Sequence, residues 1–293
     1  MTSNYHTKPN NYVSHVQLKV SNLQQSIAYY TEVIGFQVLQ QTEKEAYFTA
    51  DGKTSLLSIN EIDGATSEKG HTGLYHFALL LPTRKDLGNY VQHFIEQNIK
   101  IGAGDHDVSE ALYLYDPDGN GIEIYYDRPD TEWKWDADNQ VYMTTLQVDF
   151  ESVLREADGH YNGLPANTVM GHIHLSVNNL SDTEAFYTDV LNYNVVTRYG
   201  KQALFLSTGK YHHHIGTNTW NSEGATALPS EAVGLRSYTV VLADDAEAEK
   251  VKASLRASNY VVEMFDAAPT FGGNQAFSTL DPNGIRILFT TEG

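Results

Sequence analysis

Alternating apolar and polar residues over 13–20 predict a β-strand near the start of the chain. Ser21-Asn22 is a helix-capping signal, and apolar residues at helical spacing predict a helix over 23–34. Short apolar stretches bounded by turn residues then predict three more strands, at 37–41, 45–50 and 54–60. The first sixty or so residues are therefore expected to form one unit with the order strand, helix and three strands (βαβββ).

The same order is predicted a second time further along the chain. The predicted elements are a strand at 74–81, a helix at 84–97, and strands near 99–102, at 110–115 and at 121–126. The turn Asp116-Pro-Asp-Gly-Asn-Gly is a strong hairpin signal between the last two strands. A second βαβββ unit follows from this pattern.

The chain also repeats itself on a larger scale. The sequence beginning at His15 aligns without a gap to the sequence beginning at His172, so 169–218 and 234–291 are expected to repeat the two units. The fold class predicted is α+β, with four βαβββ units paired into two cupped mixed sheets. The predicted division is an N-terminal domain at 8–128, a connecting segment at 129–167 with a short helix near 149–157, and a C-terminal domain at 168–293.

Composition narrows the class of protein. The formal net charge of −18 predicts a surface that repels nucleic acid and anionic lipid. No apolar run is long enough for a transmembrane helix, and the N-terminal residues lack the apolar core of a signal peptide. The chain has no cysteine, which excludes disulfides, thiolate ligands and a cysteine nucleophile and fits a cytoplasmic protein.

Several motifs carry a resemblance to a known family. The stretches GLYHFALLLP, SEALYLYDPDGNGIEIYYDRP, GHIHLSV and YHHHIGTNTW resemble the vicinal oxygen chelate superfamily, which includes glyoxalases, bleomycin-resistance proteins and type I extradiol dioxygenases. The resemblance covers nearly the whole chain. It implies that a pair of units forms a cupped sheet with a metal ion inside the cup.

Three residues are predicted to hold that metal. His15, His76 and Glu123 each lie on the strand face opposite the apolar residues, so all three side chains are expected to point into the cup. A buried carboxylate is costly unless it is paired or bound to a metal. Two imidazoles and one carboxylate form the facial triad of non-heme Fe(II) oxygenases. Fe(II) is the expected metal, with Mn(II) and Zn(II) as alternatives.

The second half of the chain serves as an internal control. His172 matches His15, but Ser237 matches His76, and Arg286 stands where a counterpart of Glu123 is expected. The metal is therefore predicted in the N-terminal domain and a degenerate site in the C-terminal one. His172, His174 and the run His212-His213-His214 leave three alternatives open: a weak metal or anion site, an active C-terminal half, or a hydrogen-bonded polar lining.

The resemblance also implies acid and base residues. Resembling dioxygenases carry a tyrosine ten residues before the ligand glutamate, which is Tyr113 here, and a histidine in the loop before that strand, for which His106 is the candidate. A further acid/base histidine precedes the second ligand in the family. In the N-terminal half only His71 is available there, whereas the run 212–214 resembles that position in the other half.

The function predicted is an Fe(II)-dependent extradiol dioxygenase that cleaves catechol or a substituted catechol with O2 to a muconic semialdehyde. The first alternative is a glyoxalase-like lyase, isomerase or thiol transferase, which would need a fourth ligand such as Glu61. The second alternative is a small-molecule-binding resistance protein. No nucleic acid or membrane partner is expected, and self-association into a homo-oligomer is compatible with the predicted sheets.

Overall fold

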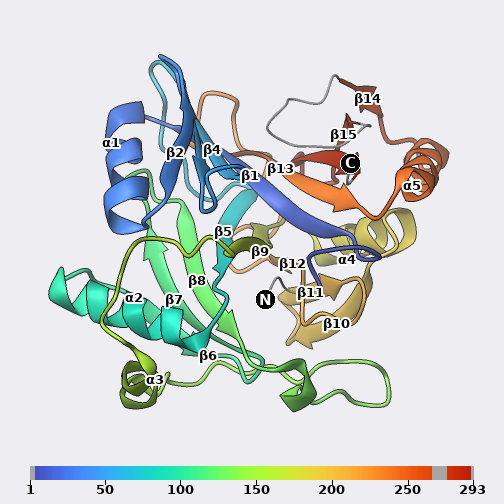
Figure 1. Ribbon diagram of the computed structural model, residues 1–293. Coiled ribbons are helices and arrows are strands. Elements are labelled where there is room, and N and C mark those ends of the chain that lie inside the picture. Colours follow the sequence, from blue (N-terminus) through green and yellow to red (C-terminus); the bar gives the residue numbers. More distant parts are fainter. Residues whose placement is uncertain (1–3, 266–275, 292–293) are drawn as a thin grey trace.

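Two eight-stranded mixed sheets form the protein in a computed structural model that describes residues 4–265 and 276–291 (Figure 1). The β1 sheet has the order β14-β15-β16-β13-β1-β4-β3-β2. Its strands are Tyr12–Val20 (β1), Gln37–Gln41 (β2), Glu45–Thr49 (β3), Ser55–Glu61 (β4), Gly234–Leu242 (β13), Glu263–Met264 (β14), Ala276–Leu280 (β15) and Arg286–Thr291 (β16).

The β5 sheet has the order β10-β11-β12-β9-β5-β8-β7-β6. Its strands are Gly73–Leu80 (β5), Gly102–Asp105 (β6), Ser109–Tyr115 (β7), Gly121–Asp127 (β8), Val169–Ser176 (β9), Asn194–Tyr199 (β10), Ala203–Ser207 (β11) and Ile215–Asn218 (β12). The four predicted βαβββ units and their assembly into two mixed sheets are confirmed.

The predicted pairing of the units is wrong. β1 of the first unit pairs antiparallel with β13 of the fourth, and β5 of the second pairs antiparallel with β9 of the third. Figure 1 shows β1 in blue beside β13 in orange. Residues 8–128 and 168–293 are thus repeats in sequence, but each sheet contains one unit from the first half and one unit from the second half. Sequence similarity shows which units are alike and carries no information on which central strands exchange hydrogen bonds.

The helices follow the predicted capping signals. Asn22 accepts a hydrogen bond from the Gln25 N–H at the start of Leu23–Ala28 (α1), which continues into a π-helical turn at Tyr29–Val33. The remaining helices are Arg84–Glu96 (α2), Phe150–Glu156 (α3), Leu180–Ala185 (α4) with a π-helical turn at Phe186–Val190, and Asp245–Ala257 (α5); a 3₁₀ turn lies at Asp130–Glu132.

One strand begins later than predicted. The stretch 99–102 is used mainly to end α2, because the Ile99 N–H bonds back to the Phe94 carbonyl and Asn98 has a φ of 56°. β6 therefore starts only at Gly102. Among the described residues, no helix is both long and apolar enough to cross a membrane.

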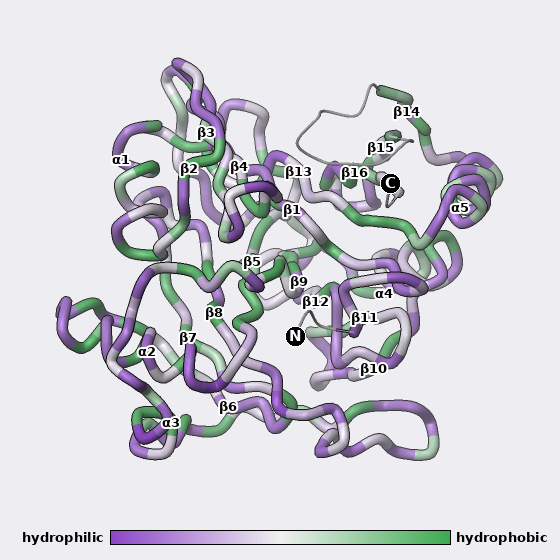
Figure 2. The backbone as a smooth tube through the Cα atoms, viewed as in Figure 1, coloured by the Kyte–Doolittle hydropathy of each residue, from purple (hydrophilic) through white to green (hydrophobic). Residues whose placement is uncertain are grey.

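Each central strand has one face in a shared apolar core. Val16, Leu18 and Val20 of β1 and Phe77 and Leu79 of β5 are fully buried in it, as the alternation predicts. Figure 2 shows apolar residues concentrated in the strands, with hydrophilic residues in many of the connecting loops. The opposite strand faces are left free to hold polar side chains, which is where the candidate site lies.

Candidate metal centre and active site

The central strands of the β5 sheet bring two histidines and one glutamate together. His76 lies on β5, Glu123 on β8 and His172 on β9. Ala78 is paired with Glu123 on one side and with His172 on the other, so these residues share a sheet face, and His76 is two positions from Ala78 on that same face. One potential ligand atom from each of the three residues lies within 4.8 Å of the other two.

The three side chains are buried and fit a divalent cation. His76 Nε2 lies 3.0 Å and His172 Nε2 3.3 Å from Glu123 Oε2, close to the separation of about 3 Å expected between neighbouring ligands of one metal. Neither nitrogen makes a hydrogen bond, and both are sealed from solvent. Two imidazole nitrogens without a hydrogen bond and one carboxylate oxygen therefore lie close together, and a metal ion bound by a facial triad would coordinate all three.

Electrostatics supports the same assignment. Burial lowers the pKa of His172 to about 4, so this imidazole is neutral at neutral pH. Burial alone would raise the pKa of Glu123, but the adjacent His172 and His76 outweigh it and hold the pKa well below its usual value. An ionised carboxylate facing a neutral imidazole in a buried site lacks a counter-charge, and a divalent cation would supply it.

His15 does not belong to this cluster, which corrects the predicted ligand set. It lies on β1, paired with Thr239 in the other sheet. His172 occupies the ligand position that was predicted for His15. The candidate centre therefore uses both halves of the chain and is not confined to residues 8–128. The signal for this was present in the sequence, since His172 matches His15 in the repeat.

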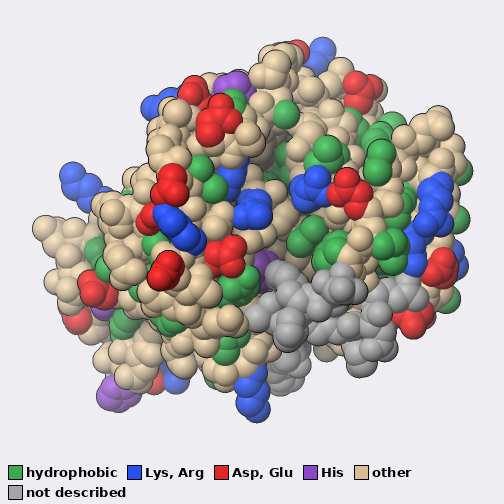
Figure 3. All heavy atoms as spheres, turned by 90° about the horizontal axis from the view of Figure 1, so that it is seen from above, with side chains coloured by type: hydrophobic (Ala, Val, Ile, Leu, Met, Phe, Trp, Pro, Cys, Tyr) green, Lys and Arg blue, Asp and Glu red, His purple; other side chains and the backbone are tan. Residues whose placement is uncertain are grey.

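The register also corrects the counterpart of Glu123. Phe77 pairs with Ile122 in the β5 sheet, and its equivalent Tyr238 pairs with Ile287 in the β1 sheet, so Glu123 corresponds to Leu288 rather than to Arg286. The β1 sheet instead borders a cavity of about 400 Å³ lined in part by Lys19, Arg236 and Arg286. Figure 3, which views that side, shows Lys and Arg side chains beside a hollow.

Tyr113 and His106 lie at the same cavity as the His76–Glu123–His172 cluster. Tyr113 is paired directly with Glu123 across β7 and β8. Its hydroxyl lies 2.7 Å from His106 Nε2, and His106 Nδ1 lies 2.7 Å from the Thr144 carbonyl oxygen. A carbonyl only accepts, so His106 carries its proton on Nδ1 and accepts from Tyr113 at Nε2. Burial, together with the charge of Glu123, raises the pKa of Tyr113 well above its usual value.

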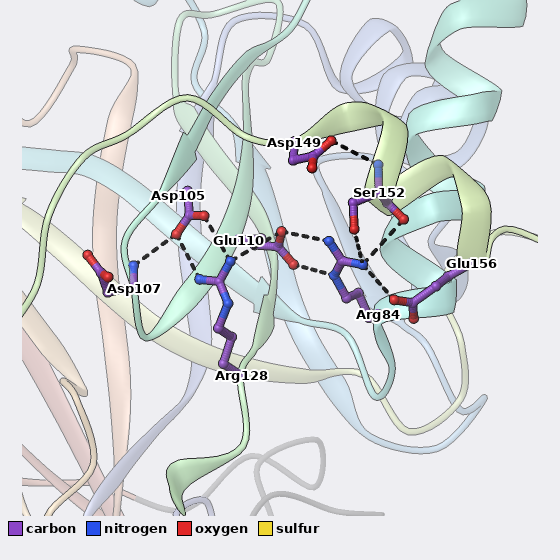
Figure 4. Close-up of polar contacts among 8 residues, drawn as sticks. All are labelled: Arg84, Asp105, Asp107, Glu110, Arg128, Asp149, Ser152 and Glu156. Carbon is purple, nitrogen blue, oxygen red and sulfur yellow. Dashed lines mark hydrogen bonds and ion pairs between the residues drawn. The ribbon is translucent and has the colours of Figure 1, made fainter. Parts of the chain in front are cut away.

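An ion-pair network around the buried Glu110 holds the loop that carries His106 (Figure 4). Glu110 accepts from Arg84 Nε at 2.6 Å and from Arg84 Nη2 at 2.9 Å. Arg128 makes two hydrogen bonds to Asp105, the residue before His106, and Asp105 also accepts from the Asp107 N–H. The bidentate contact joins the end of β6 to the end of β8, and Arg128 also lies 3.4 Å from Glu110 of β7, so the loop with His106 is held beside Tyr113.

The histidine run 212–214 divides among three environments. His213 lines the cavity and lies 4.0 Å from His172 between ring centroids. His212 Nε2 lies 2.7 Å from Asp127 Oδ1, and His214 Nε2 lies 3.0 Å from the Tyr5 carbonyl oxygen on the other side. Of the three alternatives for this run, a set made of His172, His174 and His214 is not assembled, because His214 points away.

The cavity itself has a volume of about 260 Å³ and an aromatic wall. Its apolar and aromatic lining residues include Tyr75, Leu114, Met143, Tyr199, Phe205 and Trp220. Two candidates from the sequence lie elsewhere. Glu61 caps α1 by accepting from the Leu23 N–H in the other sheet, and His71 contacts Thr226 in an exposed loop. The fourth ligand that a glyoxalase-like site would need is therefore not supplied by Glu61.

The chain belongs to the Glyoxalase/Bleomycin resistance protein/Dioxygenase superfamily, whose model matches residues 12–124 and 169–289. Among curated relatives, it is 48% identical to Catechol-2,3-dioxygenase of Bacillus subtilis (strain 168), over 95% of this chain and 96% of that protein. It is also 26% identical to Metallothiol transferase FosB of Staphylococcus haemolyticus (strain JCSC1435), over 39% of this chain and 81% of that protein.

Solved structures show the same fold at low sequence identity. A candidate dioxygenase from Bacillus subtilis subsp. subtilis strain 168 aligns with a TM-score of 0.64 at 14% identity, over 96% of this chain and 85% of that one. Glyoxalase I from Zea mays aligns with a TM-score of 0.56 at 15% identity, over 96% and 92%. The vicinal oxygen chelate fold predicted from the sequence motifs is confirmed.

Proposed function

We propose that the protein is an Fe(II)-dependent extradiol dioxygenase that cleaves the ring of catechol or a substituted catechol with O2, giving a muconic semialdehyde. The observation that carries the proposal is the buried His76–Glu123–His172 cluster at a cavity that Tyr113, His106 and His213 also line. The 48% identity to Catechol-2,3-dioxygenase over nearly the whole chain supports the same reaction.

His76, His172 and Glu123 would hold the metal on one side and leave the opposite positions open to the cavity. A bound metal would supply a Lewis-acid and redox centre at this point, at which the catechol and O2 could be activated together. His213 is the base that takes a proton from a catechol hydroxyl, since burial lowers its pKa well below the usual value and keeps it neutral. Tyr113, kept protonated and paired with His106, is the hydrogen-bond donor that assists ring opening.

The lining also indicates the substrate class. Among the described residues that line the cavity there is no Lys or Arg, and one wall is formed by Tyr75, Phe205 and Trp220. A carboxylate on the ring would be buried without a counter-charge there. We therefore expect catechol and catechols with uncharged apolar substituents to be turned over, and catechols with a ring carboxylate to be poor substrates.

Anaerobic reconstitution with Fe(II), Mn(II) or Zn(II), followed by catechol and air, tests the proposal. Oxygen uptake together with the yellow semialdehyde is expected with Fe(II). No colour and no oxygen uptake with any metal across catechol, methylcatechols and carboxylated catechols would refute it. A cytoplasmic location and self-association remain predictions, to be checked by cell fractionation and by light scattering on the purified protein.

A further inference from the structure

A chain of three side chains runs from the end of β8 to the cavity. Asp127 Oδ1 lies 2.7 Å from His212 Nε2, and His212 Nδ1 lies 2.8 Å from His213 Nδ1. We propose that Asp127 and His212 are positioning residues that fix the ring of His213 in the tautomer whose unprotonated Nε2 faces the substrate. This inference rests on the proposed function, which makes His213 the base.

The direction of the Asp127–His212 hydrogen bond follows from the chemistry of the groups, and the direction of the His212–His213 bond is part of the proposal. A carboxylate only accepts, so His212 donates from Nε2 to Asp127. One hydrogen lies between His212 Nδ1 and His213 Nδ1, and the proposal places it on His213, so that His213 Nδ1 donates and His212 Nδ1 accepts. His213 Nε2 is left as the nitrogen with a lone pair. Asp127 thus influences the tautomer of His213 through the His212 side chain that lies between them.

The surroundings hold the chain in place. Asp127 Oδ2 accepts from the Tyr211 hydroxyl at 2.9 Å, and that oxygen of Tyr211 lies 2.7 Å from the Tyr125 hydroxyl. His212 is fully buried, with its ring 5.2 Å from Trp133 between centroids. His213 is 5% exposed and lines the cavity, so its ring borders the substrate space while Nδ1 is engaged behind it.

The proton balance of the step is simple. The catechol O–H bond breaks, an N–H bond forms at His213 Nε2, and the proton already on Nδ1 stays there. His213 becomes an imidazolium, and the carboxylate of Asp127, reached through His212, offsets its positive charge. No proton moves onto Asp127. The Asp127 carboxylate and His212 therefore act through His213 and do not touch the substrate.

Asp127→Asn is the most informative variant. It preserves the shape of the side chain and is expected to reverse the direction of the hydrogen bonds to His212 and from His212 to His213. The new amide oxygen can still accept from Tyr211, while the amide nitrogen donates to His212 Nε2. His212 must then donate from Nδ1, and His213 must accept at Nδ1 and carry its proton on Nε2, where it cannot act as a base. We expect kcat to fall about 100-fold or more, with KM for catechol changed less than about threefold. His214→Gln, in the same run but directed away from the cavity, should retain near-wild-type kcat.

Nitrogen NMR of the full-length Zn(II)-loaded protein, labelled with ¹⁵N-histidine, reads the tautomers without catalysis. His212→Gln and His213→Gln assign the two rings. We expect protons on Nε2 of His212 and Nδ1 of His213 in the wild type, and the reverse in Asp127→Asn. A proton on Nε2 of wild-type His213, or an Asp127→Asn variant with unchanged kcat, would overturn the proposal. If the wild type cleaves no catechol, the proposed function fails while the NMR result still decides the tautomers.

Discussion

At three corresponding positions the β5 sheet carries His172, His76 and Glu123, whereas the β1 sheet carries His15, Ser237 and Leu288. The difference extends to the neighbouring strand. Tyr113 is paired with Glu123 in the β5 sheet, and Ser278 is paired with Leu288 in the β1 sheet. Both sheets nevertheless bury the same apolar pattern on their opposite face. Folding and chemistry therefore depend on opposite faces of the same strands, so one copy of the site can be lost without loss of the fold.

The largest expected effect separates the two matched histidines. His172→Ala should abolish ring cleavage and weaken metal binding by more than the roughly 100-fold typical for residues that only orient a ligand, because it removes one of the three candidate ligands. His15→Gln, the same position in the β1 sheet, should retain the full metal content. Metal analysis after dialysis and calorimetric titration with Fe(II) or Zn(II) measure both. Loss of metal in His15→Gln with retention in His172→Ala would reverse the comparison.

The ion pairs at the two sheets should also differ. Arg84→Met leaves the buried Glu110 carboxylate with only Arg128, at 3.4 Å, and should lower the free energy of unfolding by about 3 to 4 kcal/mol. Arg286→Gln breaks the exposed pair with Glu263 and should have no measurable effect. Urea unfolding of each variant measures its free energy of unfolding relative to wild type. Equal stability of the two variants would show that the network in Figure 4 contributes no more than a surface pair.

A pH effect is expected from the turn of the β1 sheet. Burial raises the pKa of Asp281 from 3.8 to about 6, although its carboxylate accepts from the Asn283 and Ile285 N–H groups. The folded state binds this proton more tightly, so the stabilisation is complete below about pH 4 and is lost as pH rises through 6. Relative to wild type, Asp281→Asn should therefore gain about 3 kcal/mol between pH 4 and pH 7. A difference independent of pH in denaturant unfolding would contradict this.

The smallest effect concerns the residue that faces the carboxylate position. Tyr113→Phe should lower kcat for catechol about 100-fold, which is about 2.7 kcal/mol, because the hydroxyl donor is lost while the ring remains. Ser278→Ala removes the hydroxyl at the same position of the β1 sheet and should leave kcat unchanged. Steady-state oxygen uptake measures both. An unchanged kcat in Tyr113→Phe would show that the Tyr113 hydroxyl has no catalytic role and that the side chain only lines the cavity.

Most elements and two of the three candidate ligands could be predicted from local pattern. The alternation in β1, β5 and β8 places His76 and Glu123 on the polar strand face, and the cap at Asn22 begins α1 where expected. The third ligand could not be predicted from one strand alone. His15 and His172 have the same local pattern, and only the hydrogen bonds between β5 and β9 decide that His172 is the neighbour of His76.

The proposed acid and base residues show the same limit. Tyr113 could be placed by its ten-residue distance from Glu123, since both lie on paired strands of one hairpin. His213 and Asp127 are 86 positions apart in the chain, and nothing local links them. Their connection through His212 depends on the packing of β8 against the segment before β12.

The sharing of the centre between the two halves has a consequence during synthesis. A nascent chain that has emerged only through β8 contains His76 and Glu123 but no strand to supply His172. Such a chain offers only two of the three candidate ligands, so tight binding of the proposed metal requires that β9 has docked on β5. Because that contact spans about a hundred residues, it belongs to the slow class of folding events. Binding of the proposed metal is thereby tied to synthesis of β9, and a product truncated before β9 would lack one of the three candidate ligands.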